Sequence, residues 1–435
     1  MEQLLHFTWK HRFFGTQPLS TVTGEAVEVV DVGLHNHDAG PDFFNAKVKI
    51  DGQLLAGNVE IHLRASDWYA HRHHEDPAYD NVVLHIVGES DSLCQTCSGR
   101  TLPQMVLAVP DAIRQRYDQL RQTDHYPPCY QTIPTLSRLL THSWMAALQT
   151  ERLERKSTDI ARLLPRCEGS WEKVWFVTLS RYFGFGLNSD AMEQWALSLP
   201  LQQVAHHRDN LFQIEAIFYG QAGLLQHEAT SERHREVADA DPEYLRFQQE
   251  YAYLRHKLQL HPIDYRQWRY LRLRPQNFPL VRLSQLAQLY FQNTANLSQM
   301  TDCETLEQLR GTLRTHATDY FQTHHLFGAE SRQADKQLSN ATIDILLINA
   351  AIPMLFAYGR HQHKEALCDR AIEFMEQLRP EDNHIVRMWR ECGLEVGSAA
   401  DSQALIQLKK AYCDRRDCLR CRFGFELLKE VKNSF

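Results

Sequence analysis

The sequence predicts an α+β protein, with a sheet-bearing domain at residues 1–125 and a mainly α-helical domain with a Cys-rich end at residues 126–435. Two patterns support this prediction. Up to about residue 110, alternating and β-branched segments follow one another in the order helix, three strands, helix and strand. After Pro110 the apolar residues recur at helical spacing, with Gly, Pro or Asn at the short breaks and no fixed-period repeat.

Composition narrows the class of protein. The chain has 435 residues, 43% of them hydrophobic, and a net charge of -7, so any binding of polyanions needs a local basic groove. The first residues lack the basic and apolar regions of a signal peptide, and no window reaches the ~18–20 uninterrupted apolar residues of a membrane span. Ten scattered cysteines suit a reducing compartment. We therefore expect a cytoplasmic protein that is not in a membrane.

Each element of the N-terminal domain has a local signal. An apolar run from Leu4 to Phe14 predicts an amphipathic helix that ends before Gly15. Ser66 is the N-cap residue of a second helix, and Asp51-Gly52 is the turn of a hairpin. The continuous apolar run at 81–87 is typical of a strand buried on both faces. Strands are predicted at 25–33, 45–51, 54–63, 81–87 and 102–109.

The helical domain is predicted from apolar periodicity and from its breaks. Pro275 and Pro279 exclude a helix centre around residues 274–279. Helices are expected at 136–164, 171–182, 190–199, 212–225, 244–258, 283–290, 342–358, 364–378 and 402–413.

Two carboxylates and a histidine are expected to meet at one edge of the sheet. Glu60 and His62 are two residues apart on the third strand and so share a face. Asp42 lies just before the second strand, which the hairpin pairs with the third. Carboxylate oxygens suit Mg²⁺ or Mn²⁺, and His62 could orient a metal-bound water. We predict Asp42, Glu60 and His62 as catalytic residues, with Asp42 and Glu60 as metal ligands. The alternative is a turn cap and a satisfied polar pair.

More histidines surround these three residues. His35 and His37 precede the Gly-Pro turn and are expected in a loop at the same end of the sheet. Those in and after the second helix are expected either to support the site or to lie on an exposed helix face; they are His71, His73, His74 and, on the next strand, His85. A hydrolase that binds a transition metal near His62 and His73 is a further hypothesis.

One stretch combines arginines with aromatic residues, at 265–282. Such a pattern can hold phosphates and stack on bases, so we predict Arg269, Arg272 and Arg274 as substrate-binding residues. The alternative is that these arginines pair with the acidic residues of 228–243.

Three cysteines lie close together near the end of the chain, at Cys413, Cys418 and Cys421. With a fourth ligand, from Cys129 or Cys392, they could bind zinc or an iron–sulfur cluster. The alternative is a set of free, reduced thiols.

The N-terminal residues resemble the PD-(D/E)xK nuclease superfamily. Pro41-Asp42 and Glu60-Ile61-His62 match its motif, and the predicted order of elements, αβββαβ, matches its core. The resemblance implies metal-dependent hydrolysis of phosphodiester bonds in nucleic acid, although His62 stands at the superfamily's lysine position. Some of these nucleases join a helical region with one distant and three C-terminal cysteines, which implies the same for Cys129 and the C-terminal three. The alternative function is a non-catalytic binding or scaffold protein on a nuclease-like fold.

A second resemblance covers nearly the whole chain. It is to a bacterial family, domain of unknown function 2851, which implies no activity. The residues that carry it lie at 38–43, 45–47, 56–62, 66–71, 74–87, 149–156, 214–224 and 413–421.

Overall fold

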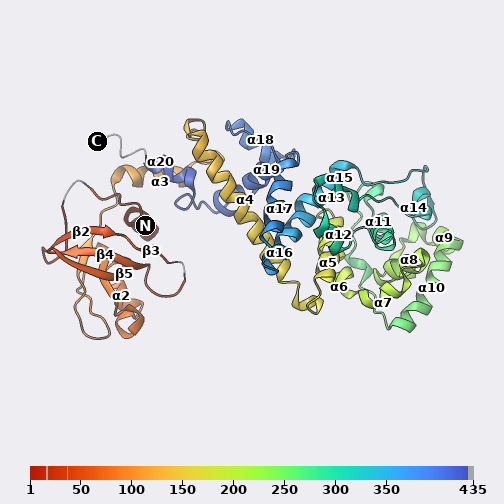
Figure 1. The fold of residues 1–435 in the computed structure, drawn as a ribbon, viewed down its shortest axis with the longest axis horizontal. Coiled ribbons are helices and arrows are strands. Elements are labelled where there is room, and N and C mark those ends of the chain that lie inside the picture. Colours follow the sequence, from red (N-terminus) through yellow and green to blue (C-terminus); the bar gives the residue numbers. More distant parts are fainter. Residues whose placement is uncertain (16–17, 37, 430–435) are drawn as a thin grey trace. The chain divides into compact units, whose positions relative to one another are not determined.

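The structure, a computed structural model, describes residues 1–15, 18–36 and 38–429. The chain forms two compact units. The first unit contains Met1–Trp144, Glu391–Leu394 and the described residues from Leu408 on, and the second contains Met145–Arg390 and Glu395–Gln407. In Figure 1 the strands of the first unit are red and orange, and most helices of the second run from yellow to blue. The mixed α+β class predicted from the sequence is thus confirmed.

The division of the chain differs from the predicted boundary after residue 125. The Cys-rich end, which we placed with the helical domain, belongs to the unit that contains the sheet. The reason is local packing, because the Trp144 and Tyr412 rings meet at a centroid distance of 5.4 Å. A long connection back from the helical region therefore completes the first unit.

The first unit is built on one mixed sheet. Its strand order is β1-β2-β4-β5-β6-β7, and β3 pairs with β4 on one side of this path. The strands from β1 to β5 are antiparallel, whereas β5, β6 and β7 are parallel. The bounds are β1 Leu19–Ser20, β2 Ala26–Asp31, β3 Leu34–His35, β4 Phe43–Ile50, β5 Gln53–Arg64, β6 Val82–Glu89 and β7 Gln104–Val106.

Local conformation explains the register of the central strands. Asp51 and Gly52 have φ values of 46° and 82°, as a tight turn with the twist of a hairpin requires. A bulge shifts the β4–β5 register between Phe43 and Ala46, and Asn45 there has a φ of 56°. A Cβ on Gly57 would lie 2.4 Å from Val83 Cγ1, so this glycine allows β5 and β6 to approach closely.

Three helices accompany the sheet: α1 (Glu2–Lys10), α2 (Asp67–Ala70) and α3 (Asp111–Gln122). Helix α1 buries Leu4, Leu5, Phe7 and Trp9 and packs against β5 and β6. Helix α2 lies in the crossover between β5 and β6, where two short 3-10 helices follow it, His73–Glu75 and Pro77–Tyr79. The last described helix, α20 (Arg422–Lys429), packs against α3.

The second unit is mainly helical, and all nine predicted helices are present with modest changes in their ends. The helices missed by the sequence are short. The bounds are α4 Arg138–Ala161 (which begins in the first unit), α5 Trp171–Phe183, α6 Ser189–Ser198, α7 Leu201–Val204, α8 Leu211–Gln221, α9 Glu232–Asp239, α10 Pro242–Leu258, α11 Pro279–Gln292, α12 Leu297–Asp302, α13 Leu306–Thr312, α14 Asp319–Thr323, α15 Asn340–Leu346, α16 Ile352–His361, α17 Glu365–Gln377, α18 His384–Glu391 and α19 Ala399–Leu408, with a small hairpin of β8 His324–Leu326 and β9 Ala329–Glu330.

One helical segment of this unit, Asn340–His361, is long and apolar enough to cross a membrane by length and composition alone. Its mean hydropathy is 1.7, and 67% of that window is buried within the structure. A buried core helix has the same properties. Asp344 and Asn349 lie inside this segment and interrupt its apolar run. For this reason the sequence alone did not indicate a membrane span here.

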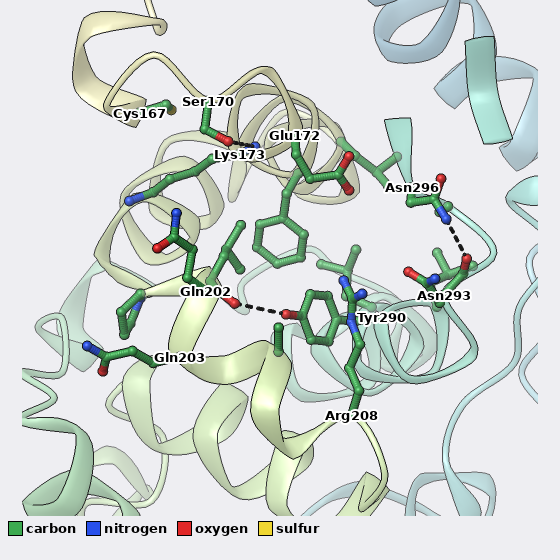
Figure 2. Close-up of a pocket in the computed structure, with 18 of the residues that line it drawn as sticks. Cys167, Ser170, Glu172, Lys173, Gln202, Gln203, Arg208, Tyr290, Asn293 and Asn296 are labelled. Carbon is green, nitrogen blue, oxygen red and sulfur yellow. Dashed lines mark hydrogen bonds between the residues drawn. The ribbon is translucent and has the colours of Figure 1, made fainter. Parts of the chain in front are cut away.

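The helical unit also contains an open pocket of about 530 Å³. Glu172, Lys173 and Arg208 lie around it, as Figure 2 shows. The Arg208 guanidinium lies over the Tyr290 ring, 4.4 Å from its centroid, and the Glu172 carboxylate accepts a hydrogen bond of 3.0 Å from the Leu297 N–H. These contacts provide partners for two of the charged groups in a wall that mixes polar and apolar side chains.

A buried acid on α8 makes the stability of the second unit depend on pH. Glu215 is 7% exposed, and its carboxyl accepts a 2.7 Å hydrogen bond from the Tyr219 hydroxyl. Burial raises the pKa of Glu215 to about 7 from 4.5. Folding therefore favours the protonated form of Glu215. The stability that this residue contributes is fully present below pH 4.5 and is lost as the pH rises through 7.

Glu215→Gln should remove this dependence. The pKa difference of about 2.5 corresponds to roughly 3 kcal/mol in total. Between pH 5 and pH 8 the free energy of unfolding of the variant should gain most of this amount relative to that of the wild type. Urea unfolding of both proteins at the two pH values measures it. Glu236→Gln, at an exposed position on α9, is the matched control and should change nothing. An equal pH response in wild type and Glu215→Gln would contradict the prediction.

Candidate metal centre

Two hydrogen bonds join the chain at Asp42, where β4 begins, to the chain at Glu60 and Ile61 on β5. The Glu60 Oε2 accepts a hydrogen bond of 3.1 Å from the Asp42 N–H. The Asp42 Oδ2 accepts one of 2.9 Å from the Ile61 N–H. The structure therefore brings together the two carboxyls that the strand pattern placed side by side.

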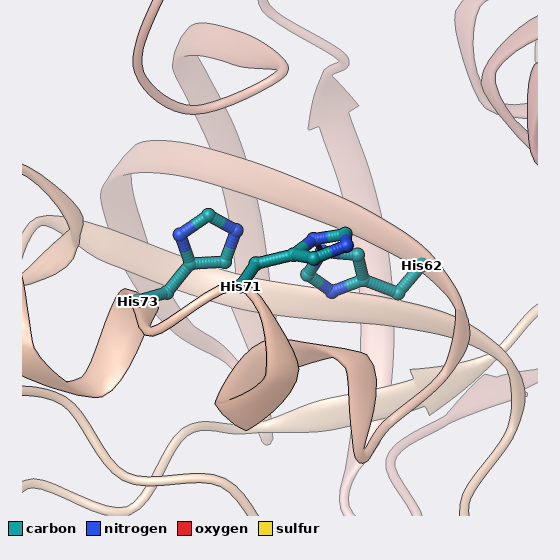
Figure 3. A group of neighbouring side chains, drawn as sticks. All are labelled: His62, His71 and His73. Carbon is teal, nitrogen blue, oxygen red and sulfur yellow. Dashed lines mark hydrogen bonds between the residues drawn. The ribbon is translucent and has the colours of Figure 1, made fainter.

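Four histidines extend this pair. The His73 Nε2 lies 3.3 Å and the His62 Nε2 3.6 Å from Glu60 Oε1. The His62 ring also contacts His71, with 3.2 Å between Nε2 and Nδ1, and His85, with 2.9 Å between Nδ1 and Nε2. One ligand nitrogen from each of His62, His71 and His73 lies within 4.8 Å of the others (Figure 3).

The fold explains this convergence. His62 follows Glu60 by two residues on β5, and His85 is the register partner of Glu60 on the parallel strand β6. His71 directly follows α2, and Arg72 has a left-handed φ of 62°, which turns the chain so that His73 also reaches the site. Of the surrounding histidines, His71 and His73 thus join the centre from the crossover after α2, with His71 exposed and His73 partly buried.

Helix α1 contributes residues that the sequence argument missed. The His6 Nε2 lies 3.5 Å from Asp42 Oδ2, and its Nδ1 lies 3.5 Å from His35 Nε2. The Glu2 carboxyl, one helical turn before His6, raises the pKa of both Asp42 and Glu60. The spacing of four residues was a signal that both face one side of the helix, but nothing in the sequence showed that this side faces the sheet edge.

Burial controls the charge of the cluster. Burial, and next the Glu60 carboxyl, raise the pKa of Asp42 to about 7. Burial raises the pKa of Glu60 to about 8, against the hydrogen bond from the Asp42 N–H. Burial and then His85 lower the pKa of His62 to about 2, and burial lowers that of His85 to about 3. Neutral imidazole is the form that binds metal ions.

The donor atoms indicate the kind of ion that fits. Three imidazole nitrogens with a carboxylate oxygen suit Zn²⁺, Mn²⁺ or Fe²⁺, whereas Mg²⁺ prefers oxygen alone. A dication here would also favour the ionised forms of Asp42 and Glu60. Mn²⁺ is the ion that fits both these donor atoms and the sequence-based prediction of Mg²⁺ or Mn²⁺.

The other predicted residues lie elsewhere. Arg269, Arg272 and Arg274 are exposed and belong to the second unit. The three C-terminal cysteines and Cys129 belong to the first unit. His74 lies 3.4 Å from Glu75, and His37 is outside the described residues.

A groove of about 1030 Å³ in the first unit is lined in part by His6 and His35, and His6 connects it to the centre through its contact with Asp42. Its walls are basic and aromatic. The charged lining residues are Lys10, Arg415, Arg416, Arg420, Arg422, Asp417 and Glu426, and the aromatic ones are Phe7, Trp144, Tyr412 and Phe425. Five cations against two anions give this groove a positive charge in a protein whose net charge is -7.

The fold and the site define a mixed α+β protein with a histidine–carboxylate centre beside a basic groove. A known family, described as "Protein of unknown function (DUF2851)", matches residues 2–384, and the chain belongs to this family. No curated protein and no solved structure matches the chain.

Binding of Mn²⁺ should stabilise the folded protein. At about 100 times its dissociation constant, Mn²⁺ should add about 2.7 kcal/mol to the free energy of unfolding. Mn²⁺ is chosen because thiolates bind it poorly, so the cysteines contribute little. Titration calorimetry and thermal unfolding measure the effect.

The double variant with His71→Ala and His73→Ala should lose this stabilisation. His74→Ala, on the next residue of the same turn, is the matched control and should keep it. Equal Mn²⁺ binding by the double variant and the control would show that the histidine group is not the metal centre.

Proposed function

We propose that this protein is a metal-dependent nuclease, which hydrolyses phosphodiester bonds of nucleic acid. The observation that carries the proposal is the cluster of Asp42, Glu60 and the histidines, which lies where β4 begins, beside the second half of β5. The order α1, β2, β4, β5, α2, β6, antiparallel and then parallel, supports the resemblance of this unit to the PD-(D/E)xK core.

Glu60, His62, His71 and His73 would hold the ion, with the Asp42 carboxyl as a neighbour of Glu60. A bound dication polarises a phosphoryl oxygen and lowers the pKa of water. His62 stands where the superfamily has lysine. With a pKa lowered to about 2 by burial and neighbouring imidazoles, it carries no charge and acts as a nitrogen ligand. Its contact with His85 fixes the orientation of the ring.

His6 is the group placed to accept the proton of the attacking water. It lines the groove, and its Nε2 lies 3.5 Å from Asp42 Oδ2. The Asp42 carboxylate stabilises the imidazolium that forms when His6 takes this proton. Asp42 therefore has two roles in this proposal. It is part of the carboxyl pair of the metal centre, and it stabilises the protonated form of His6.

The groove supports nucleic acid as the substrate. Arginine side chains hold phosphates, and aromatic rings stack on bases without demanding a sequence. The Lys10 and Arg420 cations lie close enough that Arg420, after burial, lowers the pKa of Lys10. Such mutual repulsion is relieved when a polyanion lies between them. In this proposal these residues take the role first assigned to the 265–282 stretch.

Cleavage of DNA or RNA should require Mn²⁺ and both carboxyls. Asp42→Ala and Glu60→Ala should reduce cleavage to background, whereas His6→Ala should lower kcat by about 10²-fold with little change in KM. Gel assays on single- and double-stranded substrates measure this, and Glu75→Ala is the control. Binding of polynucleotide without cleavage under any of these conditions would instead indicate the non-catalytic alternative.

Binding of the substrate should depend on the groove. Arg420→Ala should raise KM and reduce the slope of log K against log salt by roughly 0.7–0.9, the value for one phosphate contact. Arg269→Ala, in the second unit, should change neither quantity. An effect confined to Arg269→Ala would return the substrate site to the stretch at 265–282.

A further inference from the structure

The open pocket of the helical unit lies between α5, α11 and the segment that leads from α7 to α8. Lys173 and Phe176 come from α5, and Tyr290 comes from α11. Arg208 follows a short 3-10 helix, Ala205–His207. The volume of about 530 Å³ falls within the range of sites that hold small molecules, roughly 300–1,000 Å³. All of its lining residues belong to the second unit, whereas the histidine centre and the basic groove belong to the first.

Hydrogen bonds hold the walls of this pocket in place. The Tyr290 hydroxyl donates to Leu201 O at 3.2 Å and so joins α11 to α7. The Trp175 indole donates to Ala295 O at 2.7 Å and so joins α5 to the loop before α12. The pocket is therefore formed in advance, and a ligand that enters it needs to order little of the chain.

The Arg208 guanidinium is held flat against a ring in one wall. It lies over Tyr290, 4.4 Å from the ring centroid, and both residues lie on the same side of the pocket in Figure 2. Among the residues that the structure describes, no carboxylate forms an ion pair with Arg208, and its buried Nε–H has no hydrogen-bond acceptor. Stacking fixes the plane of a guanidinium and leaves its Nη edge for paired hydrogen bonds to a carboxylate or a phosphate.

A second cation lies on another side of the pocket. The Lys173 side chain is 15% exposed, and in Figure 2 it lies on the side of Gln202, away from Arg208. Its Nζ is 3.8 Å from Glu168 Oε1, but the Glu168 side chain is 84% exposed. Because solvent screens a pair of this kind, it compensates little of the Lys173 charge.

The acid nearest the middle of α5's first turn, Glu172, is already engaged by the backbone. One of its oxygens accepts the 3.0 Å hydrogen bond from the Leu297 N–H. Burial raises the pKa of Glu172, against this hydrogen bond and the charge of Arg208, so burial disfavours its ionised form. Two cations, one unpaired and one weakly paired, therefore make the pocket attractive to an anion.

Apolar side chains supply much of the remaining wall. They are Phe176, Leu179, Leu201, Leu286 and Leu289. Such a surface removes the apolar body of a ligand from water, which favours binding. Asparagine and glutamine amides complete the lining, and they both donate and accept hydrogen bonds, so they do not select the charge of a ligand.

We propose that this pocket binds a small organic acid, in which a carboxylate or a phosphate is attached to an apolar body. The acid group pairs with the Nη edge of Arg208, and Lys173 adds to the attraction. The body packs against Phe176 and the leucines. This inference does not depend on the proposed nuclease activity, because the pocket lies in the other unit.

Titration calorimetry of the full chain with three probes that share one ring system tests the proposal. The probes are naphthoate, naphthyl phosphate and the neutral naphthylmethanol, each substituted at the same ring position, with EDTA present to keep metal ions out of the first unit. We expect one acid molecule per chain, bound about 10-fold or more tightly than the alcohol, the gain typical of hydrogen bonds to a charged group. The tighter of the two acids identifies the head group that fits Arg208.

Two variants should shift the affinity for the acids in opposite directions. Arg208→Gln should weaken it by about 10-fold or more, so that the preference over the alcohol is lost. Glu172→Gln removes a negative charge and should strengthen it. The alcohol should bind these proteins alike, which reports that the pocket is intact. Arg162→Gln, at an exposed position after α4, is the matched control, and Arg420→Ala, in the groove of the first unit, should also change nothing.

The wild type and Glu172→Gln keep the proposal falsifiable even if Arg208→Gln fails to fold. No saturable binding of either acid at millimolar concentration, or equal affinity for the acids and the alcohol, would overturn it. Weaker binding of the acids to Glu172→Gln would show that the pocket does not select anions. Loss of binding in Arg420→Ala would assign the acids to the groove instead.

Discussion

Two reciprocal hydrogen bonds, from the Asp42 N–H to Glu60 and from the Ile61 N–H to Asp42, are the interaction on which the site depends. They fix the chain that enters β4 against the centre of β5, beyond the point where the bulge at Asn45 shifts the regular ladder. Each carboxyl then has an oxygen directed to histidines, Glu60 toward His62 and His73, and Asp42 toward His6. These two hydrogen bonds thus bring together side chains from α1, from β5 and from the crossover after α2.

This arrangement buries two carboxyl groups, and burial disfavours their ionised forms. A bound cation would offset this effect. Without a positive charge nearby, burial holds the pKa values of Asp42 and Glu60 near 7 and 8, and burial lowers the pKa of His62 so that its imidazole stays neutral. A structural polar cluster would be expected to pair its acids with lysine or arginine. Here the described neighbours are imidazoles, which are metal ligands as well as hydrogen-bonding groups. Cys129 and the three C-terminal cysteines lie in the same unit.

Most of the sheet and the proximity of Asp42, Glu60 and His62 could be predicted, because they follow from local sequence patterns. Period-2 alternation placed Glu60 and His62 on one face, and the Asp51-Gly52 turn fixed the partner strand and hence Asp42. The roles of His71 and His73 depend on the left-handed Arg72 and on a helix of only four residues, which periodicity does not reveal. The contributions of His6 and Arg420 depend on packing between segments far apart in sequence. For the same reason the return of the Cys-rich end to the first unit was missed.

Anomalous scattering from crystals grown with Mn²⁺ tests the central claim most directly, namely that the carboxyl pair and the histidines form a metal centre. The account predicts an anomalous peak within bonding distance of Glu60 and of the ring nitrogens of His62, His71 and His73. Ordered side chains at this position without a peak, or a peak elsewhere in the first unit with none here, would contradict it.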